Sequence, residues 1–73
     1  MRKEVLMEFK ISLKAARVNA GLTILEACEK LGISKDTMIR WEREPWLISA
    51  INMDKISKVY NLSIDNINFL PEN

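Results

Sequence analysis

Apolar residues recur at intervals of three and four along most of the chain, which is the spacing of one face of an α-helix. The first such stripe consists of Leu6, Phe9, Leu13, Ala16 and Ala20. Gly21 comes directly after it and is suited to ending a helix, because glycine adopts the left-handed conformation without a steric cost. The pattern therefore predicts a first helix that contains this stripe and stops at Gly21.

A tight turn separates the next two predicted helices. Thr23 offers a hydroxyl as an N-cap, and Glu26 stands three residues later, as in a capping box, so the second helix begins here and runs to about residue 31. Gly32 follows at a position suited to a left-handed cap, and Ser34 supplies the N-cap of a third helix. This helix ends near residue 44, because Pro45 cannot continue the hydrogen-bond ladder. Two helices joined by a short turn that contains glycine form a helix-turn-helix, here over about residues 23–43.

The C-terminal part shows the same spacing in shorter segments. Asn52 is the expected N-cap of a fourth helix. The buried stripe of this helix consists of Met53, Ile56, Val59 and Tyr60. Ser63 opens a final short turn, so the C-terminal helices are expected over about residues 53–68. No segment alternates apolar and polar residues as a strand does. The sequence therefore predicts one all-α domain over residues 1–73, a small bundle of four or five helices.

Composition narrows the classes of function. The chain has 73 residues with one cysteine and no histidine, which allows no intramolecular disulfide and none of the common Cys/His zinc sites. Histidine as a general base is equally excluded, and no glycine-rich phosphate loop is present. We therefore expect no enzyme, no cofactor and no metal site. Because the sequence shows neither a secretory leader pattern nor a run of about 18 apolar residues, we expect a cytoplasmic protein of the bacterial cytosol with no membrane partner.

Charge is divided unevenly along the chain. Residues 1–43 hold nine Lys/Arg against six Asp/Glu, which gives +3, whereas residues 44–73 hold two against four, which gives −2. On the third helix, the residues expected to face the core are Ser34, Thr37, Met38 and Trp41. The residues expected on the opposite side are Asp36, Ile39, Arg40 and Arg43, with Lys35 beside them. This outward face is cationic with one apolar member, which suits either simple solvation or a polyanionic partner.

Taken together, these features resemble the xenobiotic-response-element class of helix-turn-helix proteins, to which phage Cro proteins and the N-terminal domains of phage repressors belong. The residues that carry the resemblance are Gly21-Leu22-Thr23, Ala27-Cys28, Gly32-Ile33-Ser34 and Trp41-Glu42. The resemblance covers about residues 10–70 and implies a lambda-repressor-like fold. It also implies an ion pair between Arg17 on the first helix and Glu42 on the third, which matches a pair that related proteins form. Cys28 is expected to be a core thiol, with a redox or ligand role as the alternative.

The resemblance implies double-stranded DNA as the partner and a transcriptional regulator, of the phage or prophage repressor type, as the function. The expected DNA-binding residues are Ser34, Lys35, Asp36, Thr37, Ile39, Arg40 and Arg43. Ile39 suits the thymine methyl group, and an arginine offers a fork to guanine, although single exposed apolar side chains are also common on protein surfaces. Further phosphate contacts or solvated charges are expected at Lys10, Lys14 and Lys30. No small-molecule ligand is expected.

Two positions depart from the pattern of the resembled class. Ile24 stands where many relatives carry a glutamine that bonds a DNA phosphate, and residues 45–51 are apolar where relatives often carry a basic, glycine-rich loop. We expect a homodimer with subunit contacts among Trp46, Leu47, Ile48, Ile51, Phe69 and Leu70. The alternative is that Trp46 and Phe69 close the core of the monomer. The competing function is a protein-interaction module, such as an antitoxin or anti-repressor partner, that uses the apolar residues 46–51.

Overall fold

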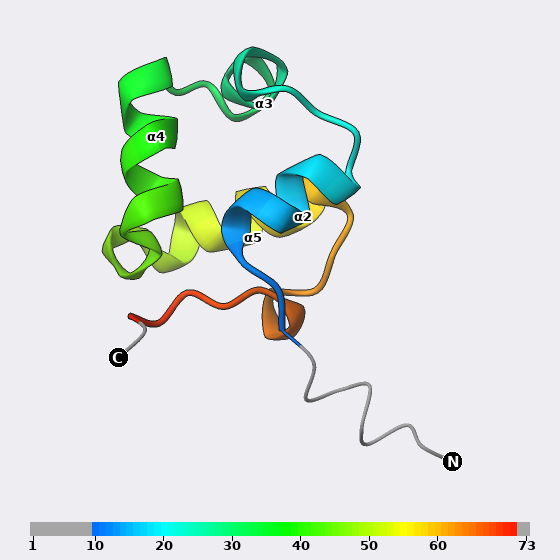
Figure 1. Ribbon diagram of the computed structural model, residues 1–73, viewed down its shortest axis with the longest axis vertical. Helices are drawn as coiled ribbons and strands as arrows, with labels where there is room; N and C mark the ends of the chain where they lie inside the picture. Colours follow the sequence, from blue (N-terminus) through cyan, green and yellow to red (C-terminus); the bar gives the residue numbers. More distant parts are fainter. Residues whose placement is uncertain (1–9, 72–73) are drawn as a thin grey trace.

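The computed structural model describes residues 10–71, in which four α-helices and two short 3-10 helices follow one another (Figure 1). These elements are α2 (Leu13–Asn19), α3 (Ile24–Leu31), α4 (Lys35–Arg43), η1 (Pro45–Leu47), α5 (Ala50–Tyr60) and η2 (Ile64–Asn66). The predicted all-α bundle is confirmed. Within the described range the one β-type feature is an isolated parallel bridge between Ile11 and Ile67.

Helix α2 begins later than the sequence predicts. Leu6 and Phe9 of the predicted stripe lie outside the described residues. Ser12 is the N-cap, and its hydroxyl accepts a hydrogen bond from the Ala15 N–H at 3.0 Å. The preceding residue, Ile11, is paired with the C-terminal segment: its N–H donates to the Asn66 carbonyl at 2.9 Å, and its carbonyl accepts from the Asn68 N–H at 2.8 Å. The expected helix through residues 10–12 is therefore wrong, because these residues form a cap and a bridge.

Helix α5 begins earlier than the sequence predicts. Asn52 is not its N-cap, because Ser49 takes that position with an extended backbone at φ −71° and ψ 161°. The Ser49 hydroxyl accepts from the Asn52 N–H at 3.3 Å. The region 45–51, expected as a loop, therefore consists of η1 and the first turn of α5. The helix ends at Asn61, which has a left-handed backbone at φ 53°.

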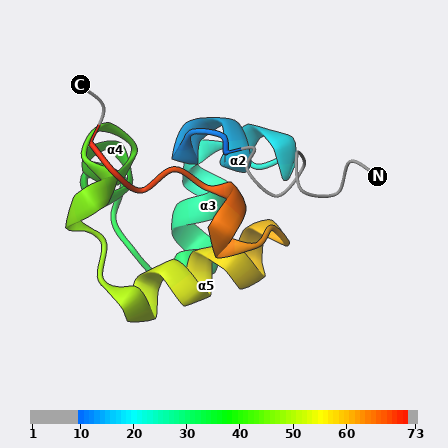
Figure 2. The same ribbon diagram turned by 90° about the horizontal axis from the view of Figure 1, so that it is seen from below.

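The core lies where the helices meet. Helix α5 packs against α2 and α3, and α4 also packs against α2 and α3 (Figures 1 and 2). The buried apolar side chains are Leu13, Ala16, Ala27, Cys28, Leu31, Met38, Trp41, Ile48, Ile56, Tyr60, Ile67 and Phe69. This set contains Cys28, as expected for a core thiol. No helix within residues 10–71 is both long enough and apolar enough to cross a membrane.

Candidate nucleic-acid interface

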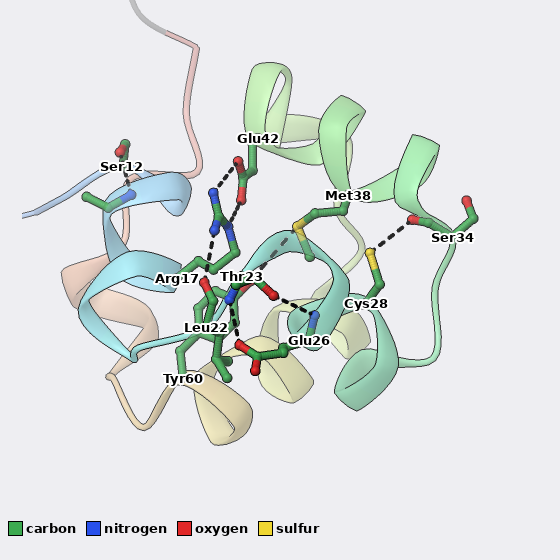
Figure 3. A network of polar contacts seen from close by, with 11 residues as sticks. Ser12, Arg17, Leu22, Thr23, Glu26, Cys28, Ser34, Met38, Glu42 and Tyr60 are labelled. Atoms are coloured by element: carbon green, nitrogen blue, oxygen red, sulfur yellow. Dashed lines mark hydrogen bonds and ion pairs between the residues drawn. The ribbon is translucent and has the colours of Figure 1, made fainter.

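Hydrogen bonds fix the beginning of α3 and the turn that joins α3 to α4. Both halves of the predicted capping box are present, since the Glu26 N–H donates to the Thr23 hydroxyl at 3.1 Å and the Thr23 N–H donates to the Glu26 carboxylate at 2.9 Å. Gly32 ends α3 with φ 71° and ψ 36°, a left-handed conformation that favours glycine. The Cys28 thiol donates to the Ser34 carbonyl at 3.5 Å (Figure 3). The left-handed cap at Gly32 and the bond from Cys28 to Ser34 set the direction in which α4 leaves the turn.

The inner face of α4 is fully packed. Met38 is 0 % exposed and Trp41 is 9 % exposed, as the helical spacing predicts. The Tyr60 hydroxyl of α5 donates to the Met38 sulfur at 3.9 Å. This bond gives the buried hydroxyl a hydrogen-bond partner in the core. Burial raises the pKa of Tyr60 to about 12, with a smaller contribution from the negative charge of Glu42. Packing on this side leaves the opposite side of α4 in solvent.

An ion pair between Arg17 and Glu42 joins α2 to α4. The Arg17 Nε donates to Glu42 Oε2 at 2.6 Å, and the Nη2 donates to Oε1 at 3.4 Å (Figure 3). The Nη1 donates to the Leu22 carbonyl at 2.9 Å. The two side chains are only 8 % and 11 % exposed. The hydrogen bond to Glu42 raises the pKa of Arg17, against the opposing effect of burial. The structure thus places the two predicted partners in direct contact and fixes α4 at a second point.

The outward face of α4 comprises Lys35, Asp36, Ile39, Arg40 and Arg43, all of them exposed. Ile39 is 38 % exposed and lies in a shallow depression that Arg40 and Arg43 also line. Within residues 10–71, no ion pair engages either arginine. The structure therefore brings together five of the seven predicted DNA-binding residues on one accessible surface.

The other two predicted DNA-binding residues are partly committed to the helix itself. The Ser34 hydroxyl accepts from the Thr37 N–H at 3.1 Å as the N-cap of α4, and it donates to the Thr37 hydroxyl at 3.0 Å. Ser34 is exposed and Thr37 is half-buried. Their hydroxyls lie at the start of α4, beside its free N–H groups, rather than on the outward face.

Four large apolar side chains are exposed in η1, in the first turn of α5 and in the C-terminal segment. We call them the apolar surface; they are Trp46, Leu47, Ile51 and Leu70, which are 45 %, 52 %, 77 % and 66 % exposed, and Trp46 and Leu70 line one cavity. Ile48 and Phe69, which the sequence placed among the subunit contacts, are instead only 4 % and 7 % exposed and belong to the core. That part of the expected contact set is wrong, because Ile48 and Phe69 turn inward while their neighbours face solvent.

A cavity of about 360 Å³ separates the end of α4 from the C-terminal segment. Its lining includes Leu13, Glu42, Arg43, Trp46, Asn68 and Leu70. Figures 1 and 2 both show the C-terminal segment passing beside η1 and the end of α4. We call this space the C-terminal cavity.

Two side chains at the site have roles that the sequence reasoning missed. Glu44 lines the depression on the outward face with Ile39 and the arginines, and its spacing of four residues from Arg40 was a signal for this position. The Lys55 ammonium donates to the Leu31 carbonyl at 3.2 Å and so satisfies a free carbonyl at the end of α3. No sequence signal links these two residues, because the contact depends on how α5 crosses α3. Within the described residues no cluster of metal-ligating side chains is present.

Comparison with known proteins identifies the family. A helix-turn-helix family model matches residues 13–67, which span α2 to the end of η2. No curated protein and no solved structure matches the chain significantly. The family is a DNA-binding one of the Cro/C1 type and is not a family of enzymes. The chain therefore belongs to the helix-turn-helix family and is a DNA-binding regulator of the Cro/C1 type.

Proposed function

We propose that the protein is a sequence-specific repressor of the phage or prophage type that reads the major groove of double-stranded DNA with α4. The observation that carries the proposal is the outward face of α4. Its three cations are exposed, while capping at Ser34, burial of Met38 and Trp41 and the Arg17–Glu42 bridge hold the helix from the other side. A helix held this rigidly can enter the groove without losing much conformational freedom on binding.

Each exposed side chain of this face suits a feature of the groove. Arg40 and Arg43 offer planar forks that match the O6 and N7 acceptors of guanine, and Ile39, which lines the same depression, suits the methyl group of thymine. Asp36 matches the amino donor of cytosine. Lys35, in the first turn, is placed to reach a phosphate or a base edge. The two carboxylates near the arginines, Asp36 and Glu44, lower the general attraction to any polyanion and so favour selective over non-selective binding.

Pairing of two chains completes the proposed function. Two recognition helices about one turn of DNA apart read a pseudo-palindromic site, which raises affinity and specificity together. The apolar surface supports a homodimer, because four large apolar side chains are exposed on a chain of 73 residues. In this proposal the protein acts in the cytoplasm, bound to the nucleoid, and needs no cofactor or small ligand to bind DNA.

The test is selection of bound sequences from a random duplex pool at moderate salt. We expect an enriched half-site, repeated with twofold symmetry, and binding that weakens steeply as salt is raised. Arg40→Ala and Arg43→Ala are expected to weaken binding to the selected site, by about 1 to 3 kcal/mol for an arginine that makes a bidentate base contact. Lys58→Ala, at an exposed position of α5, is the control and should bind as wild type does. Wild-type affinity in both arginine variants would show that α4 does not read the site.

The apolar surface also favours a second candidate function, a protein-interaction module of the antitoxin or anti-repressor type. Such a module would dock a partner protein on Trp46, Leu47 and Ile51. Docking on apolar surface depends weakly on salt, whereas neutralisation of phosphates gives a steep dependence. The salt titration of the selection experiment therefore separates the two candidates.

A further inference from the structure

Asp36 is an acidic residue on a surface that the proposed function places against a polyanion. Its side chain is exposed in the first turn of α4, and within residues 10–71 no ion pair and no side-chain hydrogen bond engages its carboxylate. A carboxylate in the first turn stabilises the helix through the helix dipole, but it also repels phosphates. An unpaired carboxylate on such a surface therefore lowers the affinity for DNA unless the bound site offers it a hydrogen-bond donor.

The carboxylate of Asp36 shares one depression with an apolar side chain and a guanidinium. The depression has a volume of about 240 Å³, and its lining includes Asp36, Ile39 and Arg40. Side chains three and four positions apart on a helix are neighbours on the same face, as these are. A hydrogen-bond acceptor, an apolar contact and a fork of donors are thus offered to DNA at one place.

In the major groove, an A·T pair does not suit Asp36 and Ile39 together. An apolar side chain suits the methyl group of thymine, but thymine presents its O4 acceptor beside that methyl group, and this oxygen repels a carboxylate. Adenine has an amino donor, which lies between its own N7 and the O4 of the paired thymine, and both of these are acceptors. Cytosine offers an amino donor to the carboxylate, but without a methyl group it gives Ile39 no apolar partner.

A cytosine that carries a methyl group at C5 satisfies both side chains. Its methyl group stands beside its N4 amino donor, and the guanine paired with it presents the O6 and N7 acceptors that suit Arg40. We propose that the depression on α4 binds a pair of 5-methylcytosine and guanine, so that the protein prefers methylated DNA sites. This inference rests on the proposed function of α4. Asp36 selects cytosine over thymine, and Ile39 selects the methylated over the unmethylated base.

The test uses four bases that combine the two features independently. 5-Methylcytosine and cytosine carry the amino donor with and without the methyl group, whereas thymine and uracil carry O4 in its place, with and without the methyl group. In the duplex obtained from the selection, each pyrimidine of one half-site is replaced in turn by each of the four bases, with guanine or adenine as its partner. The Kd of every duplex is measured at fixed salt. At one position we expect 5-methylcytosine to bind about threefold to fivefold more tightly than cytosine and about tenfold more tightly than thymine.

Two variants separate the roles of Asp36 and Ile39. Ile39→Ala should bind 5-methylcytosine and cytosine alike at that position, while it still prefers cytosine to uracil. Asp36→Asn should bind thymine nearly as well as 5-methylcytosine, because an amide also donates to O4, and it should keep the effect of the methyl group. Both side chains are exposed, so neither variant should disturb the fold. The matched controls Val18→Ala and Asp54→Asn, at exposed positions outside the depression, should show the wild-type preferences.

The outcomes for the inference and for the proposed function are distinguishable. Equal Kd values for methylated and unmethylated duplexes at every position would overturn the inference, while sequence-specific binding that Arg40→Ala weakens would leave the proposed function intact. A methyl preference that Ile39→Ala keeps, or a cytosine preference that Asp36→Asn keeps, would also overturn the inference. Failure of the proposed function looks different, because the selection would then enrich no sequence, and that result would overturn both.

Discussion

The outward face of α4 and the apolar surface near η1 are both exposed, but the chain builds them by different means. On α4 the exposed side chains alternate with buried ones on a regular helix that a capping residue and an ion pair hold in place. Near η1 the chain changes direction within a few residues, and Leu47 is exposed while its neighbour Ile48 is buried. The first surface follows from helical periodicity, whereas the second follows from the local path of the backbone.

The two regions also differ in the interactions that hold them in place. The helix-turn-helix is positioned by polar contacts, namely the capping box, the Ser34 cap and the Arg17–Glu42 bridge. Such contacts depend on direction, so they fix the orientation of α4 more sharply than packing alone. The C-terminal part is held by the burial of Ile48, Ile67 and Phe69, which is not directional, and by the backbone hydrogen bonds of the bridge at Ile11. A helix that must present chosen side chains to a groove benefits from the first kind of contact.

Breaking the Arg17–Glu42 bridge should have the largest effect on stability. Arg17→Met leaves Glu42 nearly buried without its partner, so we expect a loss of about 3 to 5 kcal/mol in the free energy of unfolding, measured in urea. Lys58→Met is the control, because the Lys58–Asp54 pair is 76 % and 58 % exposed and should contribute less than about 1 kcal/mol. In a double-mutant cycle, the losses of unfolding free energy from substitutions at Arg17 and Glu42 should not be additive. Equal effects of Arg17→Met and Lys58→Met would show that the bridge does not hold α4.

Substitutions at the neighbouring residues Leu47 and Ile48 test the description of the chain near η1. Ile48→Ala should cost about 2 to 5 kcal/mol of unfolding free energy, because it leaves a cavity in the core. Leu47→Ala, one residue earlier and 52 % exposed, should change stability by less than about 0.5 kcal/mol in the monomer. Chemical denaturation at a concentration where the protein is monomeric measures both. A larger loss for Leu47→Ala than for Ile48→Ala would contradict the buried position of Ile48 and the exposed position of Leu47.

Alkaline pH should weaken the contact between α4 and α5 through Tyr60. The folded protein keeps the phenol neutral up to a pKa of about 12, whereas in the unfolded chain it ionises at its usual pKa of 10.0. The unfolded state then binds fewer protons between these values, so this contribution is complete below pH 10 and is lost as the pH rises to 12. The loss is about 3 kcal/mol for a shift of this size.

The matched variant isolates this effect from the other groups that titrate at high pH. Tyr60→Phe keeps the ring and removes the ionisable hydroxyl, so its unfolding free energy should fall less steeply than that of wild type above pH 10. The difference between the two curves reports the effect of the Tyr60 hydroxyl. Parallel curves would mean that the hydroxyl is accessible to water in the folded state.

The helix-turn-helix could be predicted from the sequence because its signals are local. Thr23 with Glu26, Gly32, Ser34 and Pro45 each act within one turn of their own position, and the ends of α3 and α4 agree with all of them. The alternation of Met38 and Trp41 with the charged residues likewise needs only helical geometry. For this reason the outward face of α4 was predicted almost completely, apart from Glu44.

The remainder of the structure depends on contacts between segments far apart in the chain. The late start of α2 follows from the bridge between Ile11 and Ile67, which are 56 positions apart and give no local signal. Ile48 and Phe69 look like exposed residues in an apolar run, and only the fold shows that they turn inward. The contact of Lys55 with the end of α3 is equally non-local. Local patterns thus predicted the helix-turn-helix better than the part of the chain that completes the core.

The smallest expected effect concerns the start of α5, where Ser49 is the N-cap in place of the predicted Asn52. Ser49→Ala removes the hydroxyl that accepts from the Asn52 N–H, so we expect a loss of about 1 kcal/mol in the free energy of unfolding. Asn52→Ala at the third helical position should cost less, because no hydrogen bond of its side chain caps the helix. Ser49→Asp should keep or increase the stability, since a carboxylate also caps and favours the positive end of the helix dipole. Urea unfolding of the three variants measures this order. A larger loss for Asn52→Ala than for Ser49→Ala would show that Asn52 is the N-cap and that α5 begins after it.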